Sequence, residues 1–214
     1  MRIVVGITGA SGAHYATRTI EVLCARGVDV HVAASDYGRR ILADELGLTR
    51  LDKDVLSGGF PDRLTVYPGS DLGAACASGS FLHDGMIVVP CSSNTLAKIS
   101  LGITDTLVQR AAAVTLKERR RLVLAHRETP ISSTEIASMA RATDAGAIIA
   151  PLSPGLYLGQ TTIAEAVDTM VGRLLDLFNV DHGIACRWED ELAERRRVAK
   201  ERKKSLESLP DSFA

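Results

Sequence analysis

Hydrophobic and polar positions alternate in blocks along this chain, with short apolar runs separated by longer amphipathic segments. Five runs are apolar almost throughout and are predicted to form buried strands, at residues 3–7, 28–35, 85–92, 121–128 and 146–154. A helical pattern follows each run. This repeated strand–helix order predicts an α/β protein, a three-layer αβα sandwich around a mainly parallel, Rossmann-like (flavodoxin-like) sheet.

Residues 49–80 interrupt this rhythm. They are rich in glycine, show no clear period and offer one possible strand, at residues 64–67. We expect an irregular excursion here, at a subunit contact or over a ligand.

The end of the chain differs from the rest in its charge. Residues 189–204, EDELAERRRVAKERKK, place acidic residues before basic ones, which suits a helix dipole and offers pairs such as Glu191 with Arg195. A basic arm for nucleic acid is the alternative, but the interleaved glutamates favour a solvated or inter-subunit helix. We therefore divide the chain into one domain, residues 1–188, and a charged helical extension, residues 189–214.

The composition narrows the classes of function. With 214 residues, 46% of them hydrophobic, the chain can bury the core of one domain. A net charge of −1 and 4% aromatic residues give no reason to expect nucleic acid or a membrane as partner. The chain turns to glycine too soon for a signal peptide, and no apolar run reaches membrane length. Four scattered cysteines are expected to be reduced thiols, so we place the protein in the cytoplasm.

Three glycines lie at and just after the end of the first predicted strand. Gly6, Gly9 and Gly12 have the spacing G-x-x-G-x-x-G, which is neither the dinucleotide fingerprint nor a P-loop. A helix N-terminus with free amides and hydroxyl side chains binds anions without a lysine. This opening loop is therefore predicted to cradle a phosphate.

Ligands of open parallel sheets bind where strands end and loops lead into helices. Polar residues gather there: Thr8, Gly9, Ser11 and Gly12 after the first strand, Ser35 at the end of the second, and residues 90–95 (PCSSNT), 126–130 (HRETP) and 151–157 (PLSPGLY) after the others. Ser11, Ser92 and Ser93 could each do no more than cap a helix. Three such loops at one edge favour a ligand the size of a nucleotide.

Charged residues add a second feature. Arg127 and Glu128 lie at the mouth of the fourth strand, and Arg173 lies on the last predicted helix of the domain. Arg110 and Lys117 are two helical turns apart and so share one face of a helix. Any one of these could be a surface charge. A cationic cluster near a glutamate nevertheless indicates a phosphate that is bound, and protonated as it leaves.

Two other residue types, histidine and cysteine, have simpler interpretations. The five histidines show no metal-ligand pattern and are interpreted as structural, and Cys91 as a packing residue. Tyr157 is an exception, because a loop bounded by proline and glycine can act as a lid.

Four segments resemble the UbiX-type flavin prenyltransferases: GITGASGA, PCSSNTLAKISLG, LVQRAAAVTLKERRRLVLAHRETP and PLSPGLY. These enzymes are part of a wider flavin-binding group that includes cysteine-decarboxylating flavoenzymes, and the resemblance covers residues 1–188. It implies FMN at a subunit interface in a homo-oligomer, typically a dodecamer, and no metal. It also implies transfer of a dimethylallyl group from dimethylallyl phosphate or diphosphate to N5 and then C6 of reduced FMN. A UbiD-type decarboxylase would use the product.

The same resemblance implies roles for single residues. For FMN these are Gly9, Ala10, Ser11, Ser35, Ser92 and Thr95, with Arg110 near the flavin ring. For the prenyl phosphate they are Lys117, Arg127, Tyr157 and Arg173. Glu128 would assist phosphate departure, and Glu45 with Ser11 would handle protons during ring closure. Many relatives have a tryptophan where this chain has Leu72, so the prenyl pocket is expected to differ in shape.

Two other functions stay open at this point. A flavin-dependent cysteine decarboxylase would share the sandwich and a P-x-S-x-N-T loop, but it needs a substrate segment like PxMNxxMW where this chain has PLSPGLY. A non-catalytic flavin-binding accessory subunit of a decarboxylase would have lost the charged set, which this chain retains. Both observations favour the prenyltransferase.

Overall fold

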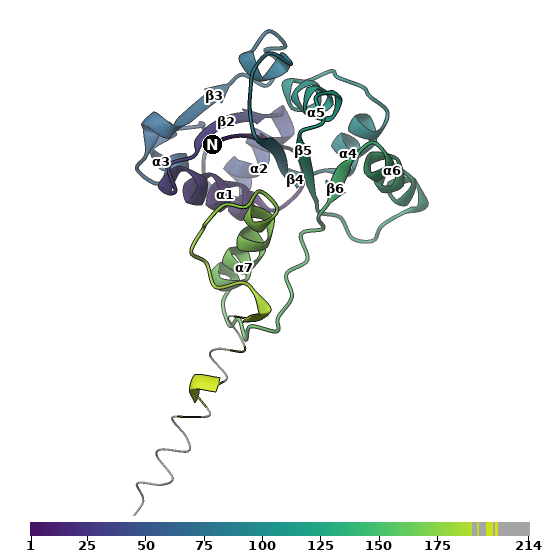
Figure 1. Ribbon diagram of the computed structural model, residues 1–214. Coiled ribbons are helices and arrows are strands. Elements are labelled where there is room, and N and C mark those ends of the chain that lie inside the picture. Colours follow the sequence, from purple (N-terminus) through teal and green to yellow (C-terminus); the bar gives the residue numbers. More distant parts are fainter. Residues whose placement is uncertain (190–191, 193–195, 199, 201–214) are drawn as a thin grey trace, which may run out of the picture.

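The computed structural model describes residues 1–189, 192, 196–198 and 200, and it contains one six-stranded sheet between helices (Figure 1). The strands are β1 (Arg2–Ile7), β2 (Asp29–Ala34), β3 (Leu64–Tyr67), β4 (Gly85–Cys91), β5 (Arg121–His126) and β6 (Ala147–Ile149). Their order is β3-β2-β1-β4-β5-β6, and every neighbouring pair is parallel. The predicted fold class is confirmed.

Helices cover both faces of this sheet. On one face lie α1 (Ala13–Ala25) and α7 (Ile163–Asp176), joined by buried residues of α2 (Asp36–Leu46) and the short α3 (Lys53–Ser57). On the other lie α4 (Ser93–Ser100), α5 (Leu107–Lys117) and α6 (Ser133–Asp144). Two single 3₁₀ turns, η1 (Pro61–Arg63) and η2 (Ala75–Ala77), belong to the segment between α3 and β4.

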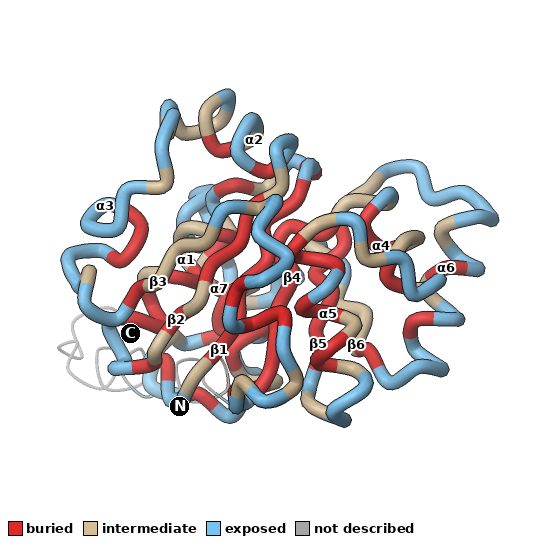
Figure 2. Tube along the Cα trace, turned by 90° about the horizontal axis from the view of Figure 1, so that it is seen from above, coloured by how far each residue is buried: buried red, intermediate tan, exposed pale blue. Residues whose placement is uncertain are grey.

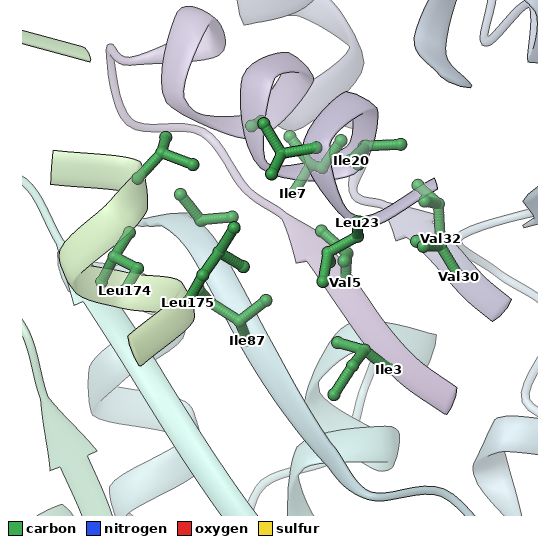
Figure 3. Packing of buried hydrophobic residues seen from close by; sticks show 14 of the residues in the cluster. Ile3, Val5, Ile7, Ile20, Leu23, Val30, Val32, Ile87, Leu174 and Leu175 are labelled. Atoms are coloured by element: carbon green, nitrogen blue, oxygen red, sulfur yellow. The ribbon is translucent and has the colours of Figure 1, made fainter. Parts of the chain in front are cut away.

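The core consists of two apolar clusters, one on each face of the sheet. In β1, Ile3, Val5 and Ile7 pack with α1 and α7 (Figure 3), whereas Val4 points to the opposite cluster. The strands are therefore buried on both sides, as the red stretches at the centre of Figure 2 show. A strand covered on both faces needs no polar side, which is why continuous apolar runs identified these strands.

All five predicted strands are present, each within one or two residues of its predicted bounds except the last. The run at residues 146–154 yields only the three-residue strand β6. Pro151 and Pro154 follow it, and proline has no amide proton to donate to a sheet. The chain therefore leaves the sheet early and enters a long connection to α7.

The excursion at residues 49–80 is more ordered than expected. It contains α3, both 3₁₀ turns and the possible strand at 64–67, which is β3 at the edge of the sheet. Without this edge strand, the order of the other five is that of flavodoxin-like sheets.

Two further predictions concern the charged extension at residues 189–214 and the expected lack of a membrane-spanning segment. Glu191 and Arg195, the expected pair in the charged extension, lie outside the described residues. Within the described part of the chain, no helix has both the length and the apolar character to cross a membrane.

Candidate active site

Thr8 joins the loops that follow β1 and β4. Its hydroxyl donates to the carbonyl oxygen of Pro90 at 2.8 Å and accepts from the amide of Ser92 at 2.9 Å. The strand order reverses between β1 and β4, which is where open α/β sheets bind ligands. Thr8 thus fixes the loops of Ser11 and Ser92 on either side of this point.

Glu45 closes the N-terminus of α1. From the last turn of α2, its carboxylate accepts hydrogen bonds from the amides of Gly12 at 3.0 Å and Ala13 at 2.8 Å. Gly12 stands at the N-cap and has no side chain to cap the helix itself. The prediction that this loop cradles a phosphate is wrong for these two amides, because they already bind an anionic group.

Ser11 and Glu45, which the family resemblance paired, are in direct contact. Partial burial acts to raise the pKa of the Glu45 carboxyl. Hydrogen bonds from the Ser11 hydroxyl and from the amides of Ala13 and Gly12 outweigh burial and hold that pKa below its ordinary value. The pair is therefore an ionised carboxylate beside an exposed hydroxyl.

The glycines of the opening loop serve the backbone and its packing. A side chain on Gly9 would collide with Tyr37 of α2, and Gly12 has a φ of +132°, which other residues rarely adopt. Gly6 lies inside β1, and Ala10 is buried. At Gly9, the group that approaches the backbone closely is a side chain of the protein itself.

Ser35 and Ser92 both cap helices at the carboxyl edge. The Ser35 hydroxyl accepts from the amide of Gly38 at 3.0 Å at the start of α2. The Ser92 hydroxyl accepts from the amide of Thr95 at 3.3 Å at the start of α4, and it donates to the Thr95 hydroxyl at 3.1 Å. The capping interpretation therefore holds for Ser92.

The capping interpretation does not hold for Ser93. Its hydroxyl lies 3.2 Å from Nε2 of His126, at the end of β5. Burial lowers the pKa of His126, so the neutral ring is favoured. This contact ties the loop after β4 to the loop that carries Arg127.

Arg127 connects three loops at this edge. Its Nε donates to the carbonyl oxygen of Ser11 at 3.2 Å, and its amide donates to the carbonyl oxygen of Cys91 at 3.2 Å. Glu128 follows it, half-buried, with its carboxylate accepting from the amide of Thr129 at 3.0 Å. Arg127 and Glu128 thus lie beside the Ser11 loop, as the sequence predicted for one edge of the sheet.

Tyr157 and Arg173 share a cavity of about 310 Å³ between the loop after β6 and α7. Apolar groups that include Pro151 and Met170 line it as well. The amide of Leu152 donates to the carbonyl oxygen of His126 at 2.8 Å, so this loop runs beside the start of the Arg127 loop. A second cavity of about 290 Å³, beside Arg39 and Tyr67, holds none of the predicted site residues.

Lys117 lies at the opposite edge of the sheet from these residues. α5 starts at the carboxyl edge, where the amide of Leu107 donates to the carbonyl oxygen of Gly69, just past β3. It ends near the loop before β4, where a methyl group on Gly79 would lie 2.9 Å from Nζ of Lys117. Lys117 pairs there with Glu118 at 2.9 Å.

The sequence predicted one cationic cluster that includes Lys117. Within one copy of the chain this prediction is wrong, because Lys117 lies apart from the other cationic residues of that cluster. Arg110, in the first turn of α5, stays at the carboxyl edge. Seven residues of helix rise about 10 Å, so a shared helical face did not mean a shared site.

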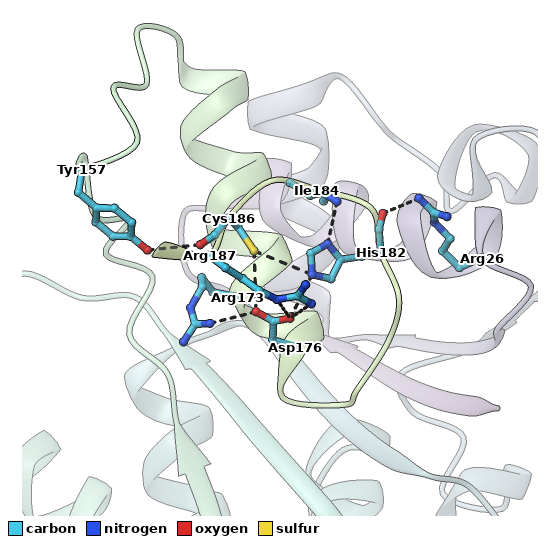
Figure 4. Close-up of polar contacts among 8 residues, drawn as sticks. All are labelled: Arg26, Tyr157, Arg173, Asp176, His182, Ile184, Cys186 and Arg187. Atoms are coloured by element: carbon cyan, nitrogen blue, oxygen red, sulfur yellow. Dashed lines mark hydrogen bonds and ion pairs between the residues drawn. The ribbon is translucent and has the colours of Figure 1, made fainter. Parts of the chain in front are cut away.

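A cluster around Asp176 was missed by sequence reasoning. Asp176 ends α7, and His182 and Cys186 of the following segment contact its carboxylate, as does Arg173 (Figure 4). The spacing D-x5-H-x3-C is the signal in the sequence, but only the turn after α7 brings the three together.

All four cysteines are buried thiols outside any disulfide, in line with the expectation of reduced thiols. Burial raises the pKa of the Cys91 thiol to about 12. A thiol that stays protonated is a poor nucleophile, which fits the interpretation of Cys91 as a packing residue.

Comparisons with known proteins complete the description of the site. Residues 1–168 match the Flavoprotein family. A flavin prenyltransferase UbiX from Thermoplasma acidophilum is 41% identical over 88% of this chain and 100% of its own length. One from Streptomyces coelicolor is 39% identical over 90% of this chain and 97% of its own length. The chain belongs to the UbiX flavin prenyltransferase family.

Solved structures of this family agree with the fold. AnUbiX (PadA1), crystallised with FMN and dimethylallyl pyrophosphate, has a TM-score of 0.81 and 41% identity, covering 87% of this chain and 96% of that one. A dodecameric FMN-dependent UbiX-like decarboxylase from Escherichia coli O157:H7 has a TM-score of 0.80 and 35% identity, covering 88% and 99%. An FMN-dependent cysteine decarboxylase of thioviridamide biosynthesis, 16% identical with a TM-score of 0.55, shares the fold alone.

Proposed function

We propose that this protein is a flavin prenyltransferase that joins a dimethylallyl group from dimethylallyl phosphate or diphosphate to N5 and C6 of reduced FMN. The observation that carries this proposal is the 41% identity, over 87% of the chain, to a protein crystallised with FMN and dimethylallyl pyrophosphate. The cysteine decarboxylase alternative has only a shared fold in its favour.

The donor groups at the junction of β1 and β4 fit FMN. Hydroxyl groups of Ser11, Ser35 and Ser92 lie at one edge of the sheet, with Thr95 behind Ser92 and the guanidinium of Arg110 at the start of α5. Hydroxyl and guanidinium donors suit the phosphate and the polar ring edge of a flavin mononucleotide. When bound, reduced FMN supplies the electron-rich N5 and C6 that accept the prenyl group.

The cavity shared by Tyr157 and Arg173 is the proposed place of the prenyl phosphate. Departure of phosphate leaves an allylic cation and a dianion, so cationic and hydroxyl donors stabilise the leaving group. Arg127, on the neighbouring loop, adds positive charge, and Glu128 beside it donates the proton as the phosphate leaves. Apolar lining around the cavity keeps water from the cation.

Glu45 and Ser11 are proposed to handle the proton released when C6 closes the new ring. Glu45 is ionised and accepts a hydrogen bond from the Ser11 hydroxyl. A carboxylate in that position can receive a proton through the hydroxyl, which is exposed toward the edge where FMN is proposed to bind.

Lys117 is proposed to act in the site of a neighbouring copy. Its position at the far edge of the sheet separates it from Arg127 and Tyr157 of its own chain. A homo-oligomer with FMN at its subunit interfaces would bring the two edges together, and a related protein is a dodecamer. We propose the same assembly here.

Two further proposals concern the surroundings of the enzyme. Prenylated FMN is a cofactor rather than an end product, and we propose a UbiD-type decarboxylase as its user. Four buried cysteines that are thiols rather than disulfides fit a reducing compartment, which supports a place in the cytoplasm.

Anaerobic incubation with reduced FMN and dimethylallyl phosphate or diphosphate tests the proposed function. Mass spectrometry of the extracted flavin is expected to find FMN heavier by one prenyl unit. FMN that stays unmodified with both donors would reject the proposal, and oxidative decarboxylation of a cysteine peptide would favour the alternative.

A further inference from the structure

One carboxylate at the end of α7 gathers donors from four side chains. Oδ1 of Asp176 accepts from Arg187, through Nη2 at 2.6 Å and Nε at 3.1 Å, and from Nε2 of His182 at 3.3 Å. Oδ2 accepts from Nη1 of Arg173 at 3.0 Å and from the Cys186 thiol at 3.8 Å (Figure 4). Burial acts to raise the pKa of Asp176, but the bonds from Arg187 and His182 hold it below its ordinary value.

The ligand atoms of Asp176, His182 and Cys186 lie within 4.8 Å of one another, close enough for a metal ion. Two features favour a clamp without metal. Two guanidinium groups already neutralise the carboxylate. The amide of Ile184 donates a hydrogen bond to Nδ1 of His182 at 2.9 Å, so Nδ1 is the acceptor nitrogen of the ring. Nε2 then carries the ring hydrogen and donates a hydrogen bond to Asp176.

The segment that contains His182 and Cys186 packs closely against α7 at Gly172. A methyl group on Gly172 would lie 2.6 Å from the sulfur of Cys186 and 3.1 Å from Cε1 of His182. The carbonyl oxygen of His182 accepts from Arg26 of α1 at 2.8 Å. Asp176 therefore anchors a turn, residues 182–187, that lies against α7 and the C-terminal end of α1.

The same turn reaches the proposed phosphate cavity. The Tyr157 hydroxyl donates to the carbonyl oxygen of Cys186 at 3.3 Å, and the Tyr157 ring meets Trp188 edge-on at a centroid distance of 6.0 Å. Figure 4 shows Tyr157 and Arg173 approaching the cluster from different elements. Both residues line the same cavity.

We propose that Asp176 is a positioning residue for the prenyl phosphate: it orients Arg173 directly and Tyr157 through the turn 182–187. This inference rests on the proposed function and assigns a role that sequence reasoning did not give to Asp176. Asp176 takes only Nη1 of Arg173, which leaves the other guanidinium donors for phosphate. The Tyr157 hydroxyl has one proton, which the Cys186 carbonyl accepts here and a bound phosphate would accept in its place. The turn thus holds this hydroxyl near Arg173 until phosphate binds.

Asp176→Asn, which keeps the size of the side chain and removes its charge, tests this role. With reduced FMN saturating, KM for dimethylallyl phosphate is expected to rise about tenfold, the size of effect that coupled neighbours show. FMN affinity, from flavin fluorescence, is expected to stay unchanged. Asp168→Asn is the matched control, because Asp168 lies on the same helix, pairs with Arg18 at 2.6 Å and does not line the cavity.

A double-mutant comparison separates positioning from loss of structure. In a Tyr157→Phe/Arg173→Ala background, Asp176→Asn is expected to change KM no further, because the residues through which it acts are gone. An equal increase in both backgrounds, or no increase in folded Asp176→Asn protein, would overturn the proposal. If Asp176→Asn does not fold, Arg187→Gln replaces it as the test variant, and a smaller increase in KM is expected. In a Tyr157→Phe background, Arg187→Gln should then cause no further increase in KM.

Calorimetry on protein loaded with oxidised FMN separates this inference from the proposed function. Dimethylallyl phosphate and inorganic phosphate are the probes, and no transfer is needed for the readout. Weaker binding of both by Asp176→Asn supports positioning even if wild-type protein forms no prenylated FMN. The positioning role would be overturned if wild type and Asp176→Asn bind the probes equally, or if wild type binds neither probe. It would also be overturned if wild-type protein retains zinc that Cys186→Ala loses.

Discussion

The two ends of the proposed site differ in how much one copy of the chain provides. At the carboxyl edge, Glu45, Ser11 and Arg127 are already connected by hydrogen bonds within one copy. At the amino edge, Lys117 is exposed and pairs only with its neighbour Glu118 among the described residues. In the function proposed above, proton handling is organised within a single chain, whereas the phosphate site takes Lys117 from a second copy.

The largest effect is expected at Glu128, the residue proposed to protonate the leaving phosphate. Glu128→Gln should lower kcat by about 10²–10⁴-fold, the usual contribution of general acid catalysis, while FMN stays bound. Rapid-mix measurement of prenylated flavin, with flavin content as control, checks this. Loss of flavin from the variant would mean that Glu128 belongs to the FMN site instead.

Lys117→Ala tests whether the second edge belongs to the site. We expect a loss of about 10²-fold in turnover, because a donor to the leaving phosphate is removed. Folding should be unaffected, since the side chain is 59% exposed.

Co-expression of Lys117→Ala with Glu128→Gln then sharpens the comparison. If Lys117 serves a neighbouring copy, mixed oligomers contain about a quarter of complete sites under random mixing and recover activity. Mixed oligomers as inactive as either parent would show that both residues must come from the same copy.

Removing the charge of Glu45 should have a smaller effect on stability. Glu45→Gln weakens the cap of α1 and is expected to cost about 1 kcal/mol. Because the pKa of Glu45 is lowered by folding, its contribution is present above its ordinary pKa of 4.5 and is lost as the pH falls through the lowered value. The difference in unfolding free energy between wild type and variant, followed by urea unfolding, should therefore shrink in acid; a constant difference would contradict the cap.

The smallest effect is expected at Asp44, the position before Glu45 in the same helix. Asp44 pairs with Arg40 at 3.2 Å, and both side chains are more than half exposed. Asp44→Asn should change stability by less than about 0.5 kcal/mol. It serves as the matched control for Glu45→Gln, and a cost equal to that variant would show that charge on α2, rather than the cap, matters.

The sequence predicted the sheet well because its strands are covered on both faces. Apolar runs predicted five of the six strands outright. β3 was predicted only as a possible strand, because it is short and three of its four residues are only partly buried. The edge that carries Ser11, Ser92 and Arg127 followed from the rule that parallel strands end together.

Residues whose partners come from distant parts of the chain were harder to place. The spacing of Arg110 and Lys117 on one helix gave no warning that α5 runs from one edge of the sheet to the other. The Asp176 cluster depends on a turn that folds back on α7, and no local pattern fixes such a return. The opening loop was predicted to cradle a phosphate because the sequence does not show that α2 brings Glu45 to the amides of Gly12 and Ala13.

A structure of the assembled oligomer with FMN and dimethylallyl phosphate tests the central claim most directly. We predict a flavin at the junction of β1 and β4, with its donor phosphate contacted by Arg127, Tyr157 and Arg173 of one copy and by Lys117 of another. Lys117 in solvent, far from any flavin, or a phosphate bound elsewhere than the cavity of Tyr157 and Arg173, would contradict it.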